Sequence, residues 1–429
     1  MRSLKAFLFR FVIIRNLSRP ARLFLLALSL DGLFFSGWSL FFNLYILEAG
    51  FSREFLGLVN AMPSIAALIF SVPMGLLSDR LGRKRAMLLG FIGGSITPFL
   101  LASVHQPVFM LVMAFLWGIT GQLYLLSHAP FMMKVSDDSS RDLLFSLSFG
   151  IWPLASSLGN ALAGQLPALL SSLFGFVEHS ARAYQVVLLA CVVTSLVALI
   201  PIALIHEPRA GTNGQAFTKP KAARVQLWSI VTRPLTVKLA LPNLLIGFGA
   251  ALLIPYMNLF FVERHHFDEK TLGLLFSLSS LMIGLACFIG PRLAANLGGK
   301  VRVVVLGQVA SLVFLILIGF SPITWLAVLG FLMRGMLMNM VAPLFDAFAM
   351  EQTDESEQGT VNSVRGWAYN AGWAIGPYLS GLVQARYGFS PLFAATGFLY
   401  LAAILVTWVF FNQTGSKIVR ETYDIVQGG

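Results

Sequence analysis

The sequence contains few charged residues and almost no cysteine. Charged side chains make up 11% of the 429 residues and hydrophobic side chains 57%, and the mean hydropathy is +0.78. A soluble domain has about 25% charged residues, so this composition excludes one. The two cysteines, Cys191 and Cys287, lie singly inside apolar runs, which excludes a disulfide framework and favours a role as small hydrophobic side chains.

Enzyme motifs are also missing from the sequence. It contains no nucleotide-binding glycine loop, no metalloprotease helix motif and no nucleophile elbow. His265 and His266 lie near Glu263 and Asp268, but adjacent histidines point apart and make a poor metal site. We therefore expect no catalytic activity, no cofactor and no metal, and a non-transporting sensor or an enzyme is the least favoured class.

What the sequence has instead is a series of long apolar runs. A bilayer core about 30 Å thick needs roughly 20 apolar residues per helix, and barrel strands would alternate in polarity, which these runs do not. The sequence therefore predicts an all-α integral membrane protein of twelve transmembrane helices. The expected spans are residues 23–47, 55–78, 87–104, 108–132, 144–170, 184–206, 237–262, 271–292, 303–320, 323–350, 362–385 and 391–412.

The net charge of +11 is distributed as in a membrane protein rather than a nucleic-acid binder. If the N-terminus is cytoplasmic, 23 of the 30 basic residues fall on the inner side and five on the outer side, and Arg334 and Arg365 lie within spans. The positive-inside rule then places both termini in the cytoplasm. We expect a multi-pass protein of the cell (inner) membrane, with the lipid bilayer as its surroundings and no nucleic-acid partner.

The chain divides into two halves that resemble each other. A polar break at 207–234 separates an N-terminal six-span region, 23–206, from a C-terminal one, 235–412, with a basic amphipathic segment at 1–22 and a tail at 413–429. At a nearly constant offset in residue number, "NLYILE" (43–48) meets "NLFFVE" (258–263), Gly159 meets Gly376 and Lys84 meets Lys300. Several such matches over six spans indicate an internal duplication.

The stretch "GLLSDRLGRKRAM" (75–87) lies between the second and third spans and carries a dense polar motif. Its pattern of glycines and charges is formed by Gly75, Asp79, Arg80, Gly82, Arg83 and Lys84. Together with two six-span halves and a basic linker, this motif resembles the major facilitator superfamily of secondary transporters, and the resemblance covers nearly the whole chain. The Gly-Pro pair that antiporters of that family often carry in span 5 is found here in span 11, at Gly376 and Pro377.

The resemblance implies two pseudo-symmetric six-helix bundles around a central cavity that opens alternately to each side and is lined mainly by spans 1, 4, 7 and 10. It also implies a cytoplasmic gate, in which Asp79 meets the N-terminus of span 11, near Arg365. Arg80 is expected to bridge to Asp137, Asp138 or Asp142. The alternative for Asp79 is a local role as a cap.

Ionisable residues within the spans are costly and therefore candidate functional groups. Asp31 has no cation within a helical turn, and desolvation favours its protonated form, so we predict that it couples transport to protons. Asp346 is the reserve proton carrier, although it could simply pair with Arg365. Arg334 is expected to face the cavity and to meet an anionic group or an acidic partner.

Other polar and aromatic residues of the cavity spans predict a surface for amphipathic organic molecules. The predicted cavity residues besides Arg334 are Trp38, Asn43, Trp117, Gln122, Tyr124, His128, Asn243, Tyr256, Asn258, Met338 and Asn339. The leading hypothesis is a monomeric, proton-coupled exporter of a small-molecule substrate. The alternative is an uptake symporter or facilitator for an anionic or sugar-like solute, which Arg334 would favour.

Overall fold

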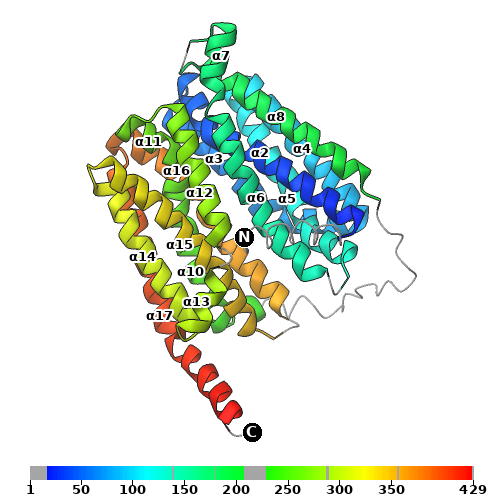
Figure 1. The fold of residues 1–429 in the computed structure, drawn as a ribbon, viewed down its shortest axis with the longest axis vertical. Coiled ribbons are helices and arrows are strands. Elements are labelled where there is room, and N and C mark those ends of the chain that lie inside the picture. Colours follow the sequence, from blue (N-terminus) through cyan, green and yellow to red (C-terminus); the bar gives the residue numbers. More distant parts are fainter. Residues whose placement is uncertain are drawn as a thin grey trace, which may run out of the picture. The chain divides into compact units, whose positions relative to one another are not determined.

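The structure is a computed structural model that describes residues 17–137, 140–177, 179–206, 229–286, 289–354 and 357–427. Across these residues the secondary structure is helical, without strands (Figure 1). Ten of the described helices are long and apolar enough to cross a membrane. The chain is therefore an all-helical, multi-pass membrane protein. Most of the predicted segment 1–22 and of the predicted linker 207–234 lies outside the described residues.

The first half of the chain forms helices that are short of polar residues except near their ends. Its elements are α2 (Arg19–Glu48), α3 (Arg53–Leu81), α4 (Arg83–Ser103), α5 (Pro107–Val135), α6 (Arg141–Ala163), α7 (Leu166–Phe174) and α8 (Ala181–Leu204). Ser18 caps α2, because its Oγ accepts a hydrogen bond from the Ala21 amide. Helix α2 packs against α6 and α8, and α4 packs against α5 and α8.

The second half repeats this arrangement. Its elements are α10 (Pro234–Leu253), the 3₁₀ turn η1 (Ile254–Tyr256), α11 (Met257–His265), α12 (Glu269–Ala286), α13 (Gly290–Asn296), α14 (Lys300–Phe320), α15 (Thr324–Glu351), α16 (Gln358–Tyr387) and α17 (Ser390–Gln427). Helix α10 packs against α16 and α17, and α14 packs against α15 and α17. Apart from α12 and α13, the contacts therefore follow the same pattern as in the first half.

Several predicted spans differ from the observed helices at glycine and proline residues. The span 144–170 is divided into α6 and α7, because Gly164 ends α6 and Pro167 lies in the first turn of α7. The span 237–262 contains the 3₁₀ turn at Pro255. Helices α6 and α16 are not among the ten apolar helices, and α16 carries a polar stripe that is part of the site described below.

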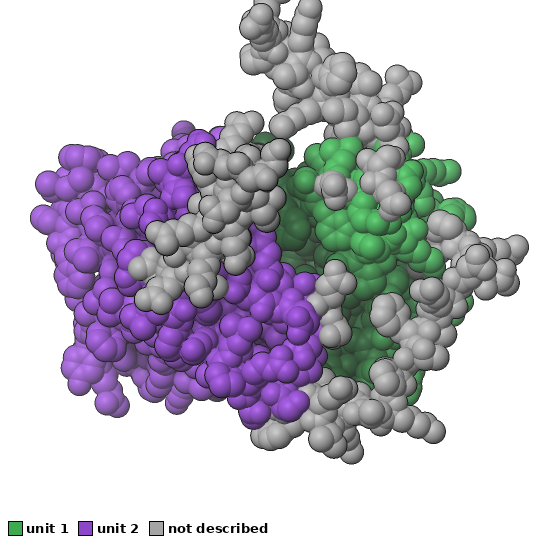
Figure 2. Space-filling view, turned by 90° about the horizontal axis from the view of Figure 1, so that it is seen from below, with its two compact units in different colours: residues 1–49, 69–216 green, residues 50–68, 217–429 purple. Residues whose placement is uncertain are grey.

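The described chain separates into two compact units, coloured in Figure 2. Unit 1 comprises residues 1–49 and 69–216, and unit 2 comprises residues 50–68 and 217–429. The boundary thus falls inside α3, whose N-terminal part, up to Leu68, packs with the second half of the chain rather than with the first. At Gly57, an added Cβ would lie 2.5 Å from the Pro377 carbonyl oxygen of α16, so this part of α3 lies directly on that helix.

Each unit contains the same close helix contact, built on a glycine. In unit 1, a Cβ added at Gly32 of α2 would lie 2.8 Å from the Trp152 carbonyl oxygen of α6. In unit 2, a Cβ added at Gly247 of α10 would lie 2.5 Å from the Tyr369 carbonyl oxygen of α16. Gly32 and Gly247 are 215 residues apart, and Trp152 and Tyr369 are 217 residues apart. These are the separations at which the two halves of the duplicated sequence match.

The loop that carries the charged motif, before α4, can be compared with the loop before α14 in the second half. The comparison shows which residues of the two loops correspond. Helix α4 follows Gly82, at a φ of 84°, and α14 follows Gly299, at a φ of 113°. Both residues have a positive φ that glycine adopts without strain. Gly82 therefore corresponds structurally to Gly299, and Arg83 to Lys300, one residue away from the Lys84–Lys300 match expected from the sequence.

Candidate functional site

The charged motif between α3 and α4 forms a local network. Arg83 makes an ion pair with Asp79, 2.5 Å between Nη2 and Oδ1, and its Nη1 donates to the Ser78 Oγ at 2.9 Å. Lys84 donates from Nζ to the Ala203 carbonyl oxygen of α8 at 2.9 Å. Gly75 lies beside Leu126 of α5, 3.9 Å from an added Cβ to its Cδ1. The motif thus holds the ends of α3, α4 and α8 together.

The expected bridge of Arg80 is not seen in the described part of the chain. Its side chain is exposed there without an ion pair, and Asp137 instead accepts hydrogen bonds from the Ser140 amide and hydroxyl. Asp138 and the side chain of Asp142 lie outside the described residues. Asp137 and Ser140 thus form a turn in which the carboxylate meets its own loop.

Asp31 lies inside unit 1, on the face of α2 that meets α6. Its Oδ2 accepts a hydrogen bond from the Trp152 Nε1, 3.2 Å away, and no cation pairs with it among the described residues. Tyr124 of α5 is close enough to interact with it electrostatically. The Tyr124 ring lies edge-on to that of His128, with centroids 4.0 Å apart. Asp31 therefore has a single neutral hydrogen-bond donor and aromatic neighbours.

The other predicted residues of unit 1 are largely packed against aromatic rings or helices. Trp38 stacks on Phe42 with ring centroids 4.9 Å apart and meets Trp117 at 5.3 Å. Asn43 is buried, and Gln122 is half-buried on α5. Trp38 and Trp117 therefore form an aromatic cluster inside unit 1 in the structure.

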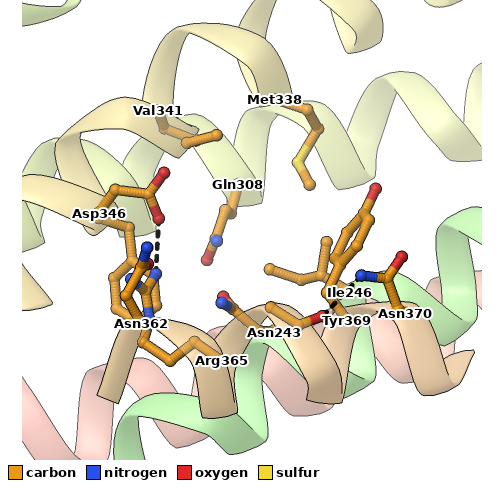
Figure 3. Close-up of a pocket in the computed structure, with 13 residues that line it drawn as sticks. Asn243, Ile246, Gln308, Met338, Val341, Asp346, Asn362, Arg365, Tyr369 and Asn370 are labelled. Atoms are coloured by element: carbon orange, nitrogen blue, oxygen red, sulfur yellow. Dashed lines mark hydrogen bonds and ion pairs between the residues drawn. The ribbon is translucent and has the colours of Figure 1, made fainter. Parts of the chain in front are cut away.

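Unit 2 contains a cavity of about 340 Å³ between α10, α14, α15 and α16, with polar groups set in a largely apolar lining (Figure 3). Its best-defined contact is the ion pair of Arg365 and Asp346, 2.6 Å between Nη2 and Oδ1. Arg365 has 1% of its side chain exposed and Asp346 65%, so a buried cation meets a carboxylate that water can reach. The lining residues are Asn243, Ile246, Gln308, Met338, Val341, Ala342, Phe345, Asp346, Asn362, Arg365, Gly366, Tyr369 and Asn370.

Arg334 lies on α15, on the side that meets α17, and is close enough to Tyr369 of the cavity lining to interact with it electrostatically. It is 8% exposed, donates from Nη2 to the Tyr400 hydroxyl, and has its guanidinium carbon 5.6 Å from the centre of the Tyr400 ring. Its Nε has no hydrogen-bond partner among the described residues. Asp31 belongs to unit 1, and in the described residues of unit 2 no carboxylate pairs with Arg334. The cation is therefore held by a phenol and an aromatic face.

The structure groups some of the predicted cavity residues and separates others. Asn243 and Met338 line the cavity of unit 2 together with Asp346 and Arg365. Tyr256 instead donates its hydroxyl to the Pro377 carbonyl oxygen at 2.8 Å, so it joins helices. Asn258 is 1% exposed and accepts from the Leu259 amide, and Asn339 donates to the Gly335 carbonyl oxygen of its own helix at 2.9 Å.

Four polar residues of the cavity were not predicted from the sequence: Gln308, Asn362, Tyr369 and Asn370. Three of them lie on α16, where together with Arg365 they occupy positions i, i+3, i+7 and i+8 of one helix face. This polar stripe is visible in the sequence of the eleventh predicted span. Gln308 is the one strongly polar side chain in the apolar run 303–320. Both features lie outside spans 1, 4, 7 and 10, which were expected to line the cavity, so neither was predicted to face it.

Polar and ionisable groups inside apolar, membrane-length helices mark functional positions of a membrane protein, and the family match identifies that protein as a transporter. The chain belongs to the Major Facilitator Superfamily, whose sequence model matches residues 24–302 and 239–422. These two overlapping matches together cover most of the chain, and the second begins in α10, near the start of the duplicated half.

Similar proteins include drug-resistance transporters. The multidrug resistance protein MdtG of Dickeya zeae is 23% identical over 400 residues, 90% of this chain and 94% of that protein. The class B tetracycline resistance protein of Escherichia coli is 25% identical over 338 residues, 76% of this chain and 78% of that protein.

Among solved structures, the nucleoside transporter NupG is similar with a TM-score of 0.70 and 16% identity, over 92% of this chain and 99% of that chain. At this identity the likeness concerns the fold.

Proposed function

We propose that the protein exports small organic solutes by alternating access, driven by protons that Asp31 carries. In this proposal, twelve helices form two six-helix bundles in the inner membrane, with both termini in the cytoplasm, and the protein works as a monomer. Asp79, Arg83 and Lys84 form part of a cytoplasmic gate. Efflux is supported by the multidrug and tetracycline resistance proteins to which the chain is similar.

The observation that carries the proposal is the environment of Asp31. A carboxylate inside a membrane helix is costly unless it is paired or protonated. Asp31 has one neutral hydrogen-bond donor, Trp152, and no cation partner among the described residues. Such a group can bind and release a proton as its surroundings change, and a group whose protonation differs between two states couples a proton gradient to transport.

The experiment is proton-driven transport in proteoliposomes by the Asp31→Asn variant, with ethidium as the transported probe. We expect loss of transport driven by a proton gradient, whereas exchange of ethidium across the vesicle membrane without a gradient persists. Asp346→Asn is measured in parallel, because Asp346 is the reserve proton carrier and lies in a membrane helix of the other unit. Undiminished proton-driven transport by Asp31→Asn would refute the role of Asp31, and loss in Asp346→Asn alone would transfer that role to Asp346.

Arg334 supports a second candidate function, uptake of an anionic or sugar-like solute. Its buried guanidinium has an unpartnered Nε and is held by Tyr400 without a described carboxylate. A guanidinium binds an anionic group with planar geometry that an ammonium does not reproduce. If Arg334 binds substrate, Arg334→Lys weakens uptake markedly. Parent-like uptake of organic anions and sugars by both Arg334→Lys and Arg334→Ala would remove the support for this function.

A further inference from the structure

The cavity of unit 2 contains buried polar atoms that no described residue satisfies. Gln308 is 5% exposed, and its Oε1 has no hydrogen-bond partner. In Figure 3 the Gln308 amide points from α14 into the cavity, toward Asn243. The Nε and Nη1 of Arg365 are also unpartnered. Buried polar groups are normally hydrogen-bonded, so an acceptor and two donors left open beside one cavity indicate a place for a polar ligand.

The remaining polar side chains of the cavity are able to both donate and accept. Asn243 and Asn362 contribute primary amides, and Asn370, whose Nδ2 donates to the Gly366 carbonyl oxygen at 3.0 Å, keeps an amide oxygen for a ligand. Tyr369, which is 37% exposed as a residue, contributes an aromatic ring. A ligand with both donors and acceptors on a ring would therefore match the cavity better than one that only donates or only accepts.

The charges of the cavity are balanced before any ligand arrives. Arg365 is the one cation of the described lining and Asp346 its one carboxylate, and they pair at 2.6 Å. An anion bound at Arg365 would lie close to the Asp346 carboxylate, and a cation bound at Asp346 would lie close to the guanidinium. Like charges at such distances repel, so a neutral ligand meets the smallest electrostatic penalty.

The corresponding position in unit 1 is filled by side chains. By the offset of the internal duplication, Gln308 corresponds to Phe91 and Val341 to Tyr124. The rings of Phe91 and Tyr124 pack with centroids 4.9 Å apart. The duplicated fold thus packs this position with aromatic rings in one half, whereas in the other half it leaves a hollow lined by amides.

We propose that the cavity of unit 2 binds a small uncharged solute carrying both hydrogen-bond donors and acceptors, and that Asp346 prevents the cavity from binding anions. Gln308 accepts from the solute, Arg365 donates to it, and Tyr369 covers part of its ring. A planar amide or heterocycle and a sugar-like polyol share this chemistry. The proposal rests on the proposed transport function for the role of the solute, but binding itself can be measured without transport.

The test is binding to the purified full chain in detergent, followed by ligand-observed NMR and thermal shift. Benzamide, benzoate and benzamidinium have nearly the same shape and differ in charge and in donor and acceptor content. We expect benzamide to bind at least about tenfold more tightly than either ion, a difference of about 1.4 kcal/mol. Methyl glucoside is measured in parallel, to test whether the cavity binds a sugar-like polyol rather than a planar amide. If neither neutral probe binds more tightly than the ions, the proposal is wrong.

Two variants locate the binding in this cavity. Gln308→Leu keeps the side-chain size but removes the acceptor, so the neutral probe that binds the parent should bind about tenfold more weakly. Asp346→Asn retains an oxygen for Arg365 but removes the negative charge, so benzoate should gain about tenfold while the neutral probe is retained. Thr407→Val is the matched control, because Thr407 is buried in unit 2 and donates only to the Ala403 carbonyl oxygen of its own helix.

The outcomes for the cavity and for export are separable. Parent-like neutral-probe binding by Gln308→Leu, or unchanged benzoate binding by Asp346→Asn, would place the site elsewhere and overturn the proposal. Should Gln308→Leu not fold, Asn243→Leu, also in the lining, replaces it with the same expected loss. Failure of proton-driven transport of both ethidium and the bound neutral probe in the parent protein, with neutral-probe binding intact, would refute the export function and leave this site standing.

Discussion

The two units place different chemistry at the same position of a duplicated fold. In unit 1, Asp31 of α2 meets Trp152 of α6, beside the Gly32 contact between these helices. In unit 2, the corresponding residues of the duplicated sequence are Ile246 and Tyr369, and both line the cavity. One half therefore has a single carboxylate among aromatic rings, and the other has an open space with a compensated charge pair.

This difference shows how a duplicated scaffold can divide two tasks. A single acid with a neutral partner is a candidate for proton exchange, whereas the acid of unit 2 is held in an ion pair with a buried guanidinium. A filled position excludes a solute, and a hollow one admits it. In the proposals made above, unit 1 therefore handles the proton and unit 2 the solute, although the helix contacts around them are alike.

The largest expected effect concerns the ion pair in unit 2, in which Arg365 is buried and Asp346 is exposed. Asp346→Leu leaves the buried Arg365 guanidinium without its carboxylate, and we expect a loss of about 2 kcal/mol in the free energy of unfolding. Arg365→Met leaves a carboxylate that is already 65% exposed and can be hydrated, so the loss should be smaller. Thermal unfolding of both variants in detergent measures the difference. An equal or larger loss in Arg365→Met would contradict this interpretation.

An intermediate effect is expected when the same position is changed in both units, at Trp152 in unit 1 and at Tyr369 in unit 2. Trp152→Phe removes the hydrogen-bond donor of Asp31, and we expect a loss of about 1 kcal/mol or somewhat more. Tyr369→Phe, at the corresponding position, removes a hydroxyl whose neighbour is the neutral side chain of Trp373, so its loss should be smaller, about 0.5 kcal/mol. The same unfolding measurement compares them. Equal losses would mean that the Asp31 contact adds nothing particular to unit 1.

The smallest effect concerns two corresponding helix caps outside the membrane. The Ser52 Oγ accepts from the Phe55 amide at 3.2 Å, and the Asp268 Oδ1 accepts from the Thr271 amide at 3.0 Å. Each replacement by Ala should cost about 0.5 to 1 kcal/mol at neutral pH. Hydrogen bonds from the Thr271 hydroxyl and amide lower the pKa of Asp268 below its usual value.

The two caps should differ in their dependence on pH. A lowered pKa in the folded state stabilises the protein above the unfolded pKa, about 3.9, and this contribution is lost as the pH falls through the folded pKa. The cost of Asp268→Ala should therefore shrink on acidification. That of Ser52→Ala should shrink less, because Ser52 carries no charge itself and only helps, after the backbone of Glu54, to lower the pKa of the exposed Glu54 carboxyl. Unfolding midpoints from pH 7 down to about pH 3 test this. A constant cost for Asp268→Ala would show that its charge contributes nothing.

The sequence predicted the helical membrane fold well because its evidence is local. Long apolar runs require helices in lipid, whatever lies beside them. The pairing of Asp346 with Arg365 was among the alternatives it left open. The cavity could not be predicted, because it depends on how α14 and α16 are rotated about their axes and on which side chains leave space. Tyr400, which accepts a hydrogen bond from Arg334, lies 66 residues after it in the sequence. Nothing in that spacing predicts the contact.

The paired glycine contacts also bear on the ancestry of the chain. Gly32 and Gly247 lie where an added Cβ would collide with the backbone of the neighbouring helix, so no substitution there is neutral, whatever its polarity. Asp31 and Ile246, one residue earlier, meet no such limit and have diverged from a common position into an acid and a hydrocarbon. The two halves therefore share the glycine contacts, whereas the residues beside them differ in both charge and size. The common origin of the two halves is therefore seen most clearly at these two glycines, which have no side chain.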